Sequence, residues 1–179
     1  MGDNTFLGDR NGVRTPMQWS ADRNGGFSRA PFHRLFLPTI NEGQYSYRSV
    51  NVEAGSNDSH SLYHFIRRLL AIRNQHAAVF GRGEFRNLEV ENPHVFAFIR
   101  EFEGKTVLVA ANLSRYAQSA CLPLPDFCGR QPVELFSRAA FRGIGEEPYP
   151  LTFGPHGFYW FALEEEAHVQ EEVPPPPAF

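Results

Sequence analysis

Short apolar runs, separated by Gly, Pro and Asp, fill the chain from about residue 95 to residue 163 and restrict its fold more than any other feature. The runs at 95–99 and 106–110 flank Glu103-Gly104, a pair that is typical of a tight β-hairpin turn. Further runs follow at 120–124, 133–136, 150–153 and 158–163. Their length and spacing predict an antiparallel β-sandwich.

One amphipathic helix is expected before these β-segments, from about Ser59 to Gln75. Apolar residues recur there at i, i+3 and i+4 spacing: Leu62, Phe65, Ile66, Leu69 and Ile72. Asp58 and Ser59 are the expected N-caps. Because so broad an apolar face needs a partner, either the sandwich covers it or a domain outside this chain does.

Residues 1–50 are crowded with Gly, Asn, Asp, Arg and Pro, and show neither helical nor strand periodicity. Irregular segments of that length are uncommon in compact domains unless they bind something or belong to a larger body. The other end, with its acidic residues and Pro174 to Pro177, is too polar and proline-rich to join a core.

Composition excludes several functional classes. The formal net charge of -3, from 17 basic and 20 acidic residues, indicates neither a nucleic-acid surface nor an anionic membrane surface. No apolar run approaches the roughly 18 residues of a membrane span, and no signal peptide is evident, so we expect a cytoplasmic protein. The two cysteines, Cys121 and Cys128, do not form a disulfide framework.

Catalytic and metal-binding patterns were sought among the acidic residues and histidines. Asp3, Asp9 and Asp22 are available in the first segment, but lone loop aspartates more often cap helices or stabilise turns. His60 and His64 have i, i+4 spacing without the other residues of a metalloprotease motif. We therefore expect no metal, no cofactor and no catalytic residue in this chain.

The segment from Gly8 to Trp19 offers guanidinium groups, amides and an indole, which are groups that bind hydroxyls and stack on sugar rings. An equally physical reading is that Arg14 pairs with a buried carboxylate and Trp19 fills a core. Composition alone does not decide between them.

The same segment carries a family resemblance. Residues 1–4, 7–10, 12–19 (Gly-Val-Arg-Thr-Pro-Met-Gln-Trp) and 24–30 resemble the stretch after the last barrel strand of trehalose synthases in the α-amylase superfamily, glycoside hydrolase family 13. Residues 50–54, 60–62, 112–115, 132–136 and 154–161 also resemble trehalose synthase sequences, so the match extends to about Glu164. The Arg-Thr-Pro-Met-Gln-Trp core alone is shared with oligo-1,6-glucosidases and sucrose isomerases.

The resemblance implies a mainly β chain, in which a C-terminal antiparallel β-sandwich follows the last loop and helix of a (β/α)₈ barrel. Residues 1–78 would be the end of the catalytic barrel, 79–164 the β-sandwich and 165–179 an acidic, proline-rich tail. Ligands bind at the C-terminal ends of barrel strands, so the irregular opening segment would lie on the active-site side.

The family reaction converts maltose to trehalose by intramolecular glucosyl transfer. The catalytic carboxylates come from earlier barrel strands in this family, so the resemblance implies that the chain alone is inactive. Arg14 would line the acceptor subsite, with Asp9 and Gln18 as further substrate-binding candidates. Asn11 stands where an aspartate is expected in many relatives, which weakens any charged role there.

Two alternatives stay open. Besides the isomerase, the first alternative is a carbohydrate-binding module that stacks sugars on Trp19, Tyr116, Tyr159 or Trp160, and the second is the remnant of an oligo-1,6-glucosidase-like hydrolase. Strand alternation places Tyr159 and Phe161 on one face of the sheet and Trp160 on the other. The expected partners are maltose or trehalose and the missing N-terminal barrel, with no nucleic acid and no membrane, and self-association stays open.

Overall fold

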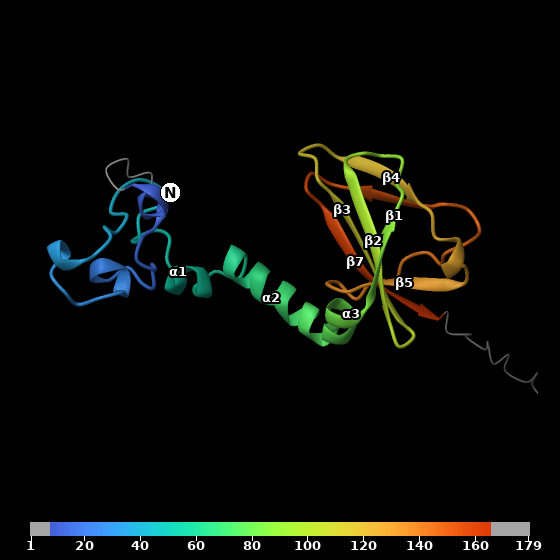
Figure 1. The fold of residues 1–179 in the computed structure, drawn as a ribbon, viewed down its shortest axis with the longest axis horizontal. Helices are drawn as coiled ribbons and strands as arrows, with labels where there is room; N and C mark the ends of the chain where they lie inside the picture. Colours follow the sequence, from blue (N-terminus) through green and yellow to red (C-terminus); the bar gives the residue numbers. More distant parts are fainter. Residues whose placement is uncertain (1–7, 166–179) are drawn as a thin grey trace, which may run out of the picture. The chain divides into compact units, whose positions relative to one another are not determined.

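The computed structural model describes residues 8–165, which form two compact units that divide between Ala71 and Ile72 (Figure 1). Residues 1–7 and the expected tail after residue 165 lie outside the described residues. The first unit contains three short 3-10 helices and two α-helix segments: η1 (Asp9–Val13), η2 (Arg23–Gly26), η3 (Phe32–Arg34), α1 (Val52–Asn57) and most of α2 (Leu62–Gln75). Residues 8–50 contain no strand, in agreement with the irregular segment expected there.

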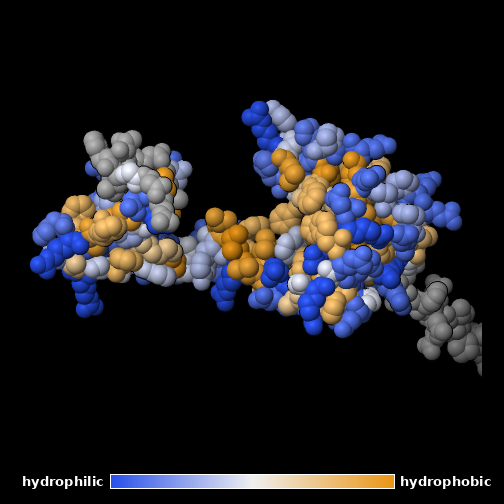
Figure 2. All heavy atoms as spheres, viewed as in Figure 1, coloured by the Kyte–Doolittle hydropathy of each residue, from blue (hydrophilic) through white to orange (hydrophobic). Residues whose placement is uncertain are grey.

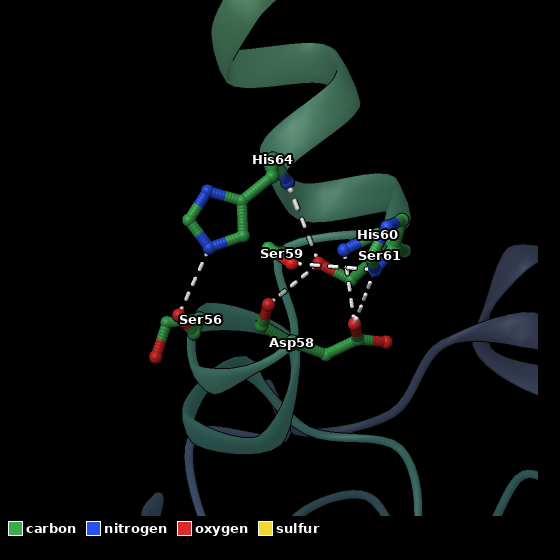
Figure 3. Close-up of polar contacts among 7 residues, drawn as sticks. Ser56, Asp58, Ser59, His60, Ser61 and His64 are labelled. Atoms are coloured by element: carbon green, nitrogen blue, oxygen red, sulfur yellow. Dashed lines mark hydrogen bonds and ion pairs between the residues drawn. The ribbon is translucent and has the colours of Figure 1, made fainter.

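The connection between α1 and α2 corrects the expected start of the amphipathic helix. α2 begins at Leu62 rather than Ser59, and the Ser61 hydroxyl accepts a hydrogen bond from the His64 amide at 3.5 Å, as an N-cap does. Asp58 instead accepts from the His60 amide at 2.9 Å and closes a local turn (Figure 3). The predicted caps Asp58 and Ser59 are therefore wrong, because this turn precedes the helix.

The apolar face of α2 is largely open to solvent in the first unit. Leu62 is 72% exposed, Ile66 43% and Leu70 51%. Figure 2 shows hydrophobic residues at the surface over this helix. Ile72, at the start of the second unit, is buried. These exposures describe the first unit by itself, so the partner that covers the face stays a prediction.

The second unit is built around the predicted hairpin. β2 (Val95–Phe102) and β3 (Lys105–Asn112) pair in antiparallel register around Glu103 and Gly104. Both turn residues have positive φ, 47° and 76°, which is the geometry of the turn expected for a two-residue loop. The hairpin prediction is confirmed.

Two antiparallel sheets form the sandwich. The larger has the order β1-β2-β3-β7-β5, and the smaller pairs β4 with β6. The remaining strands are β1 (Glu84–Leu88), β4 (Gln118–Leu122), β5 (Arg130–Glu134), β6 (Tyr149–Phe153) and β7 (Phe158–Glu165). The main core lies between the sheets and includes Ile99, Leu108, Leu122, Phe153 and Phe161. The mainly β fold class with an antiparallel sandwich is confirmed.

A second, smaller core covers the opposite face of the large sheet. Helix α3 (Ala77–Arg82) and Ile72 at the end of α2 pack there against Val107, Val109 and Leu135. Trp160 joins this second core, whereas Tyr159 and Phe161 face the main one. The predicted alternation along the last strand is confirmed.

No helix within residues 8–165 has the length and hydrophobicity needed to cross a membrane. The two thiols, Cys121 and Cys128, are free and exposed.

Candidate functional site

Gln18 links the motif segment, residues 12–19, to residues of the first unit that are distant in sequence. Its side-chain amide donates hydrogen bonds to the carbonyls of Tyr45, at 3.4 Å, and Val50. The main-chain carbonyl of Gln18 accepts a hydrogen bond from the Val52 amide at 2.9 Å. The main-chain carbonyl of Trp19 accepts one from the Glu53 amide, also at 2.9 Å. The segment before α1 is therefore tied to the motif along its main chain. The side-chain NH₂ group of Gln18 is thus already used within the chain. The predicted contact between Gln18 and substrate stays a prediction.

A tight turn follows the motif and fixes the main chain after Trp19. The Gly25 carbonyl accepts from the amides of Trp19, at 2.7 Å, and Ser20, at 3.1 Å. Asn24 and Gly25 both have positive φ, 56° and 67°, a conformation that Gly and Asn tolerate best. The buried Asn24 amide donates to the carbonyls of Ser28 and Ala30, both at 2.8 Å. These bonds hold the turn in one conformation.

Arg14 directly follows η1 in an extended conformation and is exposed. Among the side chains that the structure describes, its guanidinium has no hydrogen-bond or ion-pair partner. The reading in which Arg14 pairs with a buried carboxylate is therefore not what the described residues show. Its planar fork of five N–H donors is available for a carboxylate or a sugar hydroxyl.

Of the three aspartates of the opening segment, only Asp22 has a side chain that the structure describes. Asp3 and the side chain of Asp9 lie outside the described residues, although the backbone of Asp9 begins η1. Asp22 accepts a hydrogen bond from the Ser20 hydroxyl at 3.1 Å, and the Asp22 amide donates back to that hydroxyl at 3.2 Å. Asp22 thus stabilises the turn, as lone loop aspartates usually do.

His60 and His64 have separate partners at the start of α2. The His64 ring Nε2 lies 2.9 Å from the Ser56 carbonyl and so must carry the proton, because a carbonyl only accepts (Figure 3). His60 Nδ1 lies 3.2 Å from the Ser59 hydroxyl and 3.8 Å from Asp58. No group of three or more metal-ligating side chains occurs in the part of the chain that the structure describes.

Burial separates the four aromatic residues considered as sugar platforms. Tyr159 stacks on Phe161 at 5.4 Å between ring centroids, and Trp160 packs against Phe80 at 5.0 Å. These rings belong to the two cores of the second unit. The other two rings are exposed: Trp19, in the first unit, is about half-exposed, and Tyr116, in the second unit, is more exposed than Trp19.

Two ionisable groups of the second unit have shifted pKa values. Burial is the main cause that lowers the pKa of His76, and the charges of Arg138 and Lys105 lower it further. Burial raises the pKa of Tyr149, whose hydroxyl donates to the Arg142 carbonyl at 2.8 Å, while the Arg142 charge partly opposes the shift. Both groups lie in the second unit and are distant in sequence from the motif at residues 12–19.

Comparison with known proteins matches both halves of the chain. Residues 3–82 match the alpha amylase catalytic domain family, and residues 85–160 match the maltogenic amylase C-terminal domain family. The trehalose synthase of Thermus thermophilus is 62% identical over 164 residues, which are 92% of this chain and 17% of that protein. The chain belongs to the trehalose synthase family of the α-amylase superfamily. The trehalose synthase/amylase TreS of Mycobacterium tuberculosis H37Rv is 47% identical over 180 residues, 99% of this chain and 29% of the relative.

A solved structure of a trehalulose synthase has a similar fold to this chain of the trehalose synthase family. The trehalulose synthase MutB from Pseudomonas mesoacidophila MX-45 aligns with a TM-score of 0.64 and 27% identity, over 87% of this chain and 26% of that chain. The chain thus spans less than a third of each of these three longer proteins. It corresponds to the end of a catalytic barrel followed by a β domain.

Proposed function

We propose that this chain is the C-terminal part of an enzyme that isomerises maltose to trehalose by intramolecular glucosyl transfer. The observation that carries the proposal is the 62% identity to the Thermus thermophilus trehalose synthase, which extends over 92% of the chain. A match that covers both the motif segment and the β domain favours the isomerase over the hydrolase alternative, because the motif core alone is shared with hydrolases.

Within this enzyme, Arg14 is the side chain that we assign to the acceptor subsite. Its exposed guanidinium, without a partner among the described side chains, supports this role. Isomerisation requires the freed glucose to be retained and water to be excluded, so a donor of fixed geometry at the acceptor subsite is chemically useful. Gln18 contributes by holding the segment before α1, and Asp9 stays a candidate for a second polar contact.

The catalytic carboxylates are proposed to come from barrel strands outside this chain. Retaining glycosyl transfer needs two carboxyl groups about 5–5.5 Å apart, on opposite faces of the sugar ring. The apolar face of α2 is compatible with a missing body, since Leu62, Ile66 and Leu70 are exposed in the first unit described by itself. The chain alone is therefore expected to be inactive, and its two free thiols are compatible with the cytoplasm.

A chimera tests this proposal. The segment of Thermus thermophilus trehalose synthase that aligns with this chain is replaced by residues 1–164, and trehalose and glucose formed from maltose are measured separately. We expect trehalose as the main product. In this chimera Arg14→Ala should lower the rate of trehalose formation about tenfold or more, because a hydrogen bond to a charged group contributes about 1.5–3 kcal/mol.

Two comparisons make the chimera decisive. Arg14→Lys keeps the charge but loses the planar fork, and is expected to recover little activity. Arg23→Ala removes another exposed arginine of the same unit and should leave the rate unchanged. A folded chimera that releases only glucose would instead favour the hydrolase alternative.

A further inference from the structure

A buried asparagine locks the loops at one end of the β-sandwich. The Asn112 side chain, 2% exposed, donates to the carbonyls of Tyr116, at 2.7 Å, and Gly154, at 2.8 Å. Its side-chain oxygen accepts from the Ser114 amide at 2.8 Å. One side chain therefore fixes both the loop 113–117, between β3 and β4, and the turn 154–157, between β6 and β7.

Main-chain bonds add a third segment to this surface. The His156 amide donates to the Ser114 carbonyl at 2.9 Å, and the Leu113 amide donates to the His94 carbonyl at 2.8 Å. His156 also has a positive φ of 51°, an uncommon conformation for a residue with a side chain, and its amide bond to Ser114 helps to hold it. The three segments form one rigid surface, which we call the loop platform: residues 92–94, 113–117 and 154–157.

The loop platform displays an aromatic ring among polar donors. Tyr116 is 63% exposed and Leu113 67%. The Arg115 guanidinium lies over the Tyr116 ring, 5.3 Å from its centroid, and the side chains of His94 and His156 are exposed on the same segments. A preformed ring beside guanidinium and imidazole groups combines a stacking surface with hydrogen-bond donors.

These features fit a sugar better than a protein partner. An aromatic ring packs on the C–H face of a glucosyl unit while the donors reach its hydroxyls, and the locked loops lose little entropy on binding. A stable protein interface needs about 800 Å² per partner with an apolar centre, whereas the large hydrophobic side chains exposed here are Leu113 and Tyr116.

We propose that the loop platform is a non-catalytic binding site for a glucosyl unit of an α-glucan chain. The site lies in the β domain and uses Tyr116 as its stacking surface. The choice of an α-linked glucan rests on the proposed maltose chemistry, whereas the existence of a sugar site rests on the platform alone. A single ring binds weakly, so polymers that present many glucosyl units should be retained better than maltose.

Native gel electrophoresis of the full chain in gels with and without glycogen tests the site. We expect glycogen to retard the wild-type chain, and Tyr116→Ala to bind about three- to tenfold more weakly, the effect of losing one stacked ring. Tyr116→Trp keeps a ring and should preserve the retardation. Tyr63→Ala, which removes a partly exposed tyrosine of α2, should match the wild type.

Other outcomes contradict the proposal. Equal retardation of wild type and Tyr116→Ala, or none for the wild type, would overturn it, as would loss of retardation by Trp19→Ala alone. Self-association that Tyr116→Ala abolishes, measured by analytical ultracentrifugation, would identify a protein interface instead. In the chimera, Tyr116→Ala should leave trehalose formation at saturating maltose unchanged, which separates this site from the proposed activity.

Discussion

Gly83 shows how one residue fixes the junction between α3 and β1. Its amide donates to the Val79 carbonyl at 3.0 Å, and a Cβ at this position would clash with that same oxygen and lie 2.9 Å from the Glu101 carbonyl. Both obstacles are backbone atoms, which cannot rotate away as a side chain does. The constraint is therefore steric rather than conformational.

Gly83→Ala is expected to lower the free energy of unfolding of the second unit by about 1–3 kcal/mol, the usual effect of overpacking. Gly81→Ala is the matched control, because a Cβ at Gly81 meets no heavy atom within 4 Å and alanine favours the helix. Urea unfolding followed by circular dichroism measures both. Equal stability of the two variants would contradict the steric explanation.

At the scale of elements, His76 makes the packing of α3 sensitive to pH. It precedes α3 and is partly buried, and its pKa in the folded state lies below the ordinary value of about 6.5. The unfolded chain therefore binds this proton more readily. The stability that depends on neutral His76 is complete above the unfolded pKa, and it is lost as the pH falls through the folded pKa.

The second unit should accordingly lose stability between about pH 7 and the lower folded pKa of His76, and His76→Gln should reduce that slope. Thermal unfolding at a series of pH values measures the effect. Asn74→Gln, an exposed neighbour on α2, should keep the wild-type slope. A slope that is the same in His76→Gln and wild type would show that other groups control acid sensitivity.

Elements with a strong local pattern were predictable from the sequence. The hairpin at Glu103-Gly104 and the alternation at Tyr159, Trp160 and Phe161 needed only turn chemistry and period-2 spacing. Strand β1 was missed, because Glu84–Leu88 has little alternation and is defined by its pairing with β2. Helices α1 and α3 were missed too, since six residues are too few for a clear period.

The candidate site was predictable only in part. The family motif identified the segment around Arg14, whose guanidinium has no partner among the side chains that the structure describes. The bonds from Gln18 to Tyr45 and Val50 span 27 and 32 residues, and they depend on the path of an irregular chain. No local pattern reports that path.

At the scale of the whole molecule, the chain contains two units that differ in how much of their apolar surface is buried. The second unit has two cores of its own, whereas the first unit exposes much of its apolar helix face. The units divide between Ala71 and Ile72, and the two family matches meet between residues 82 and 85. The expected limits at 78 and 164 therefore remain predictions.

The most direct measurement is an assay of the purified 179-residue chain with maltose, in which trehalose and glucose are quantified separately. Circular dichroism of the same sample verifies that the β domain is folded. We predict that neither product exceeds the protein-free control, because we propose that the catalytic carboxylates come from barrel strands outside this chain. Formation of trehalose would contradict this account, and Asp3, Asp9 and Asp22 would then be the first residues to replace.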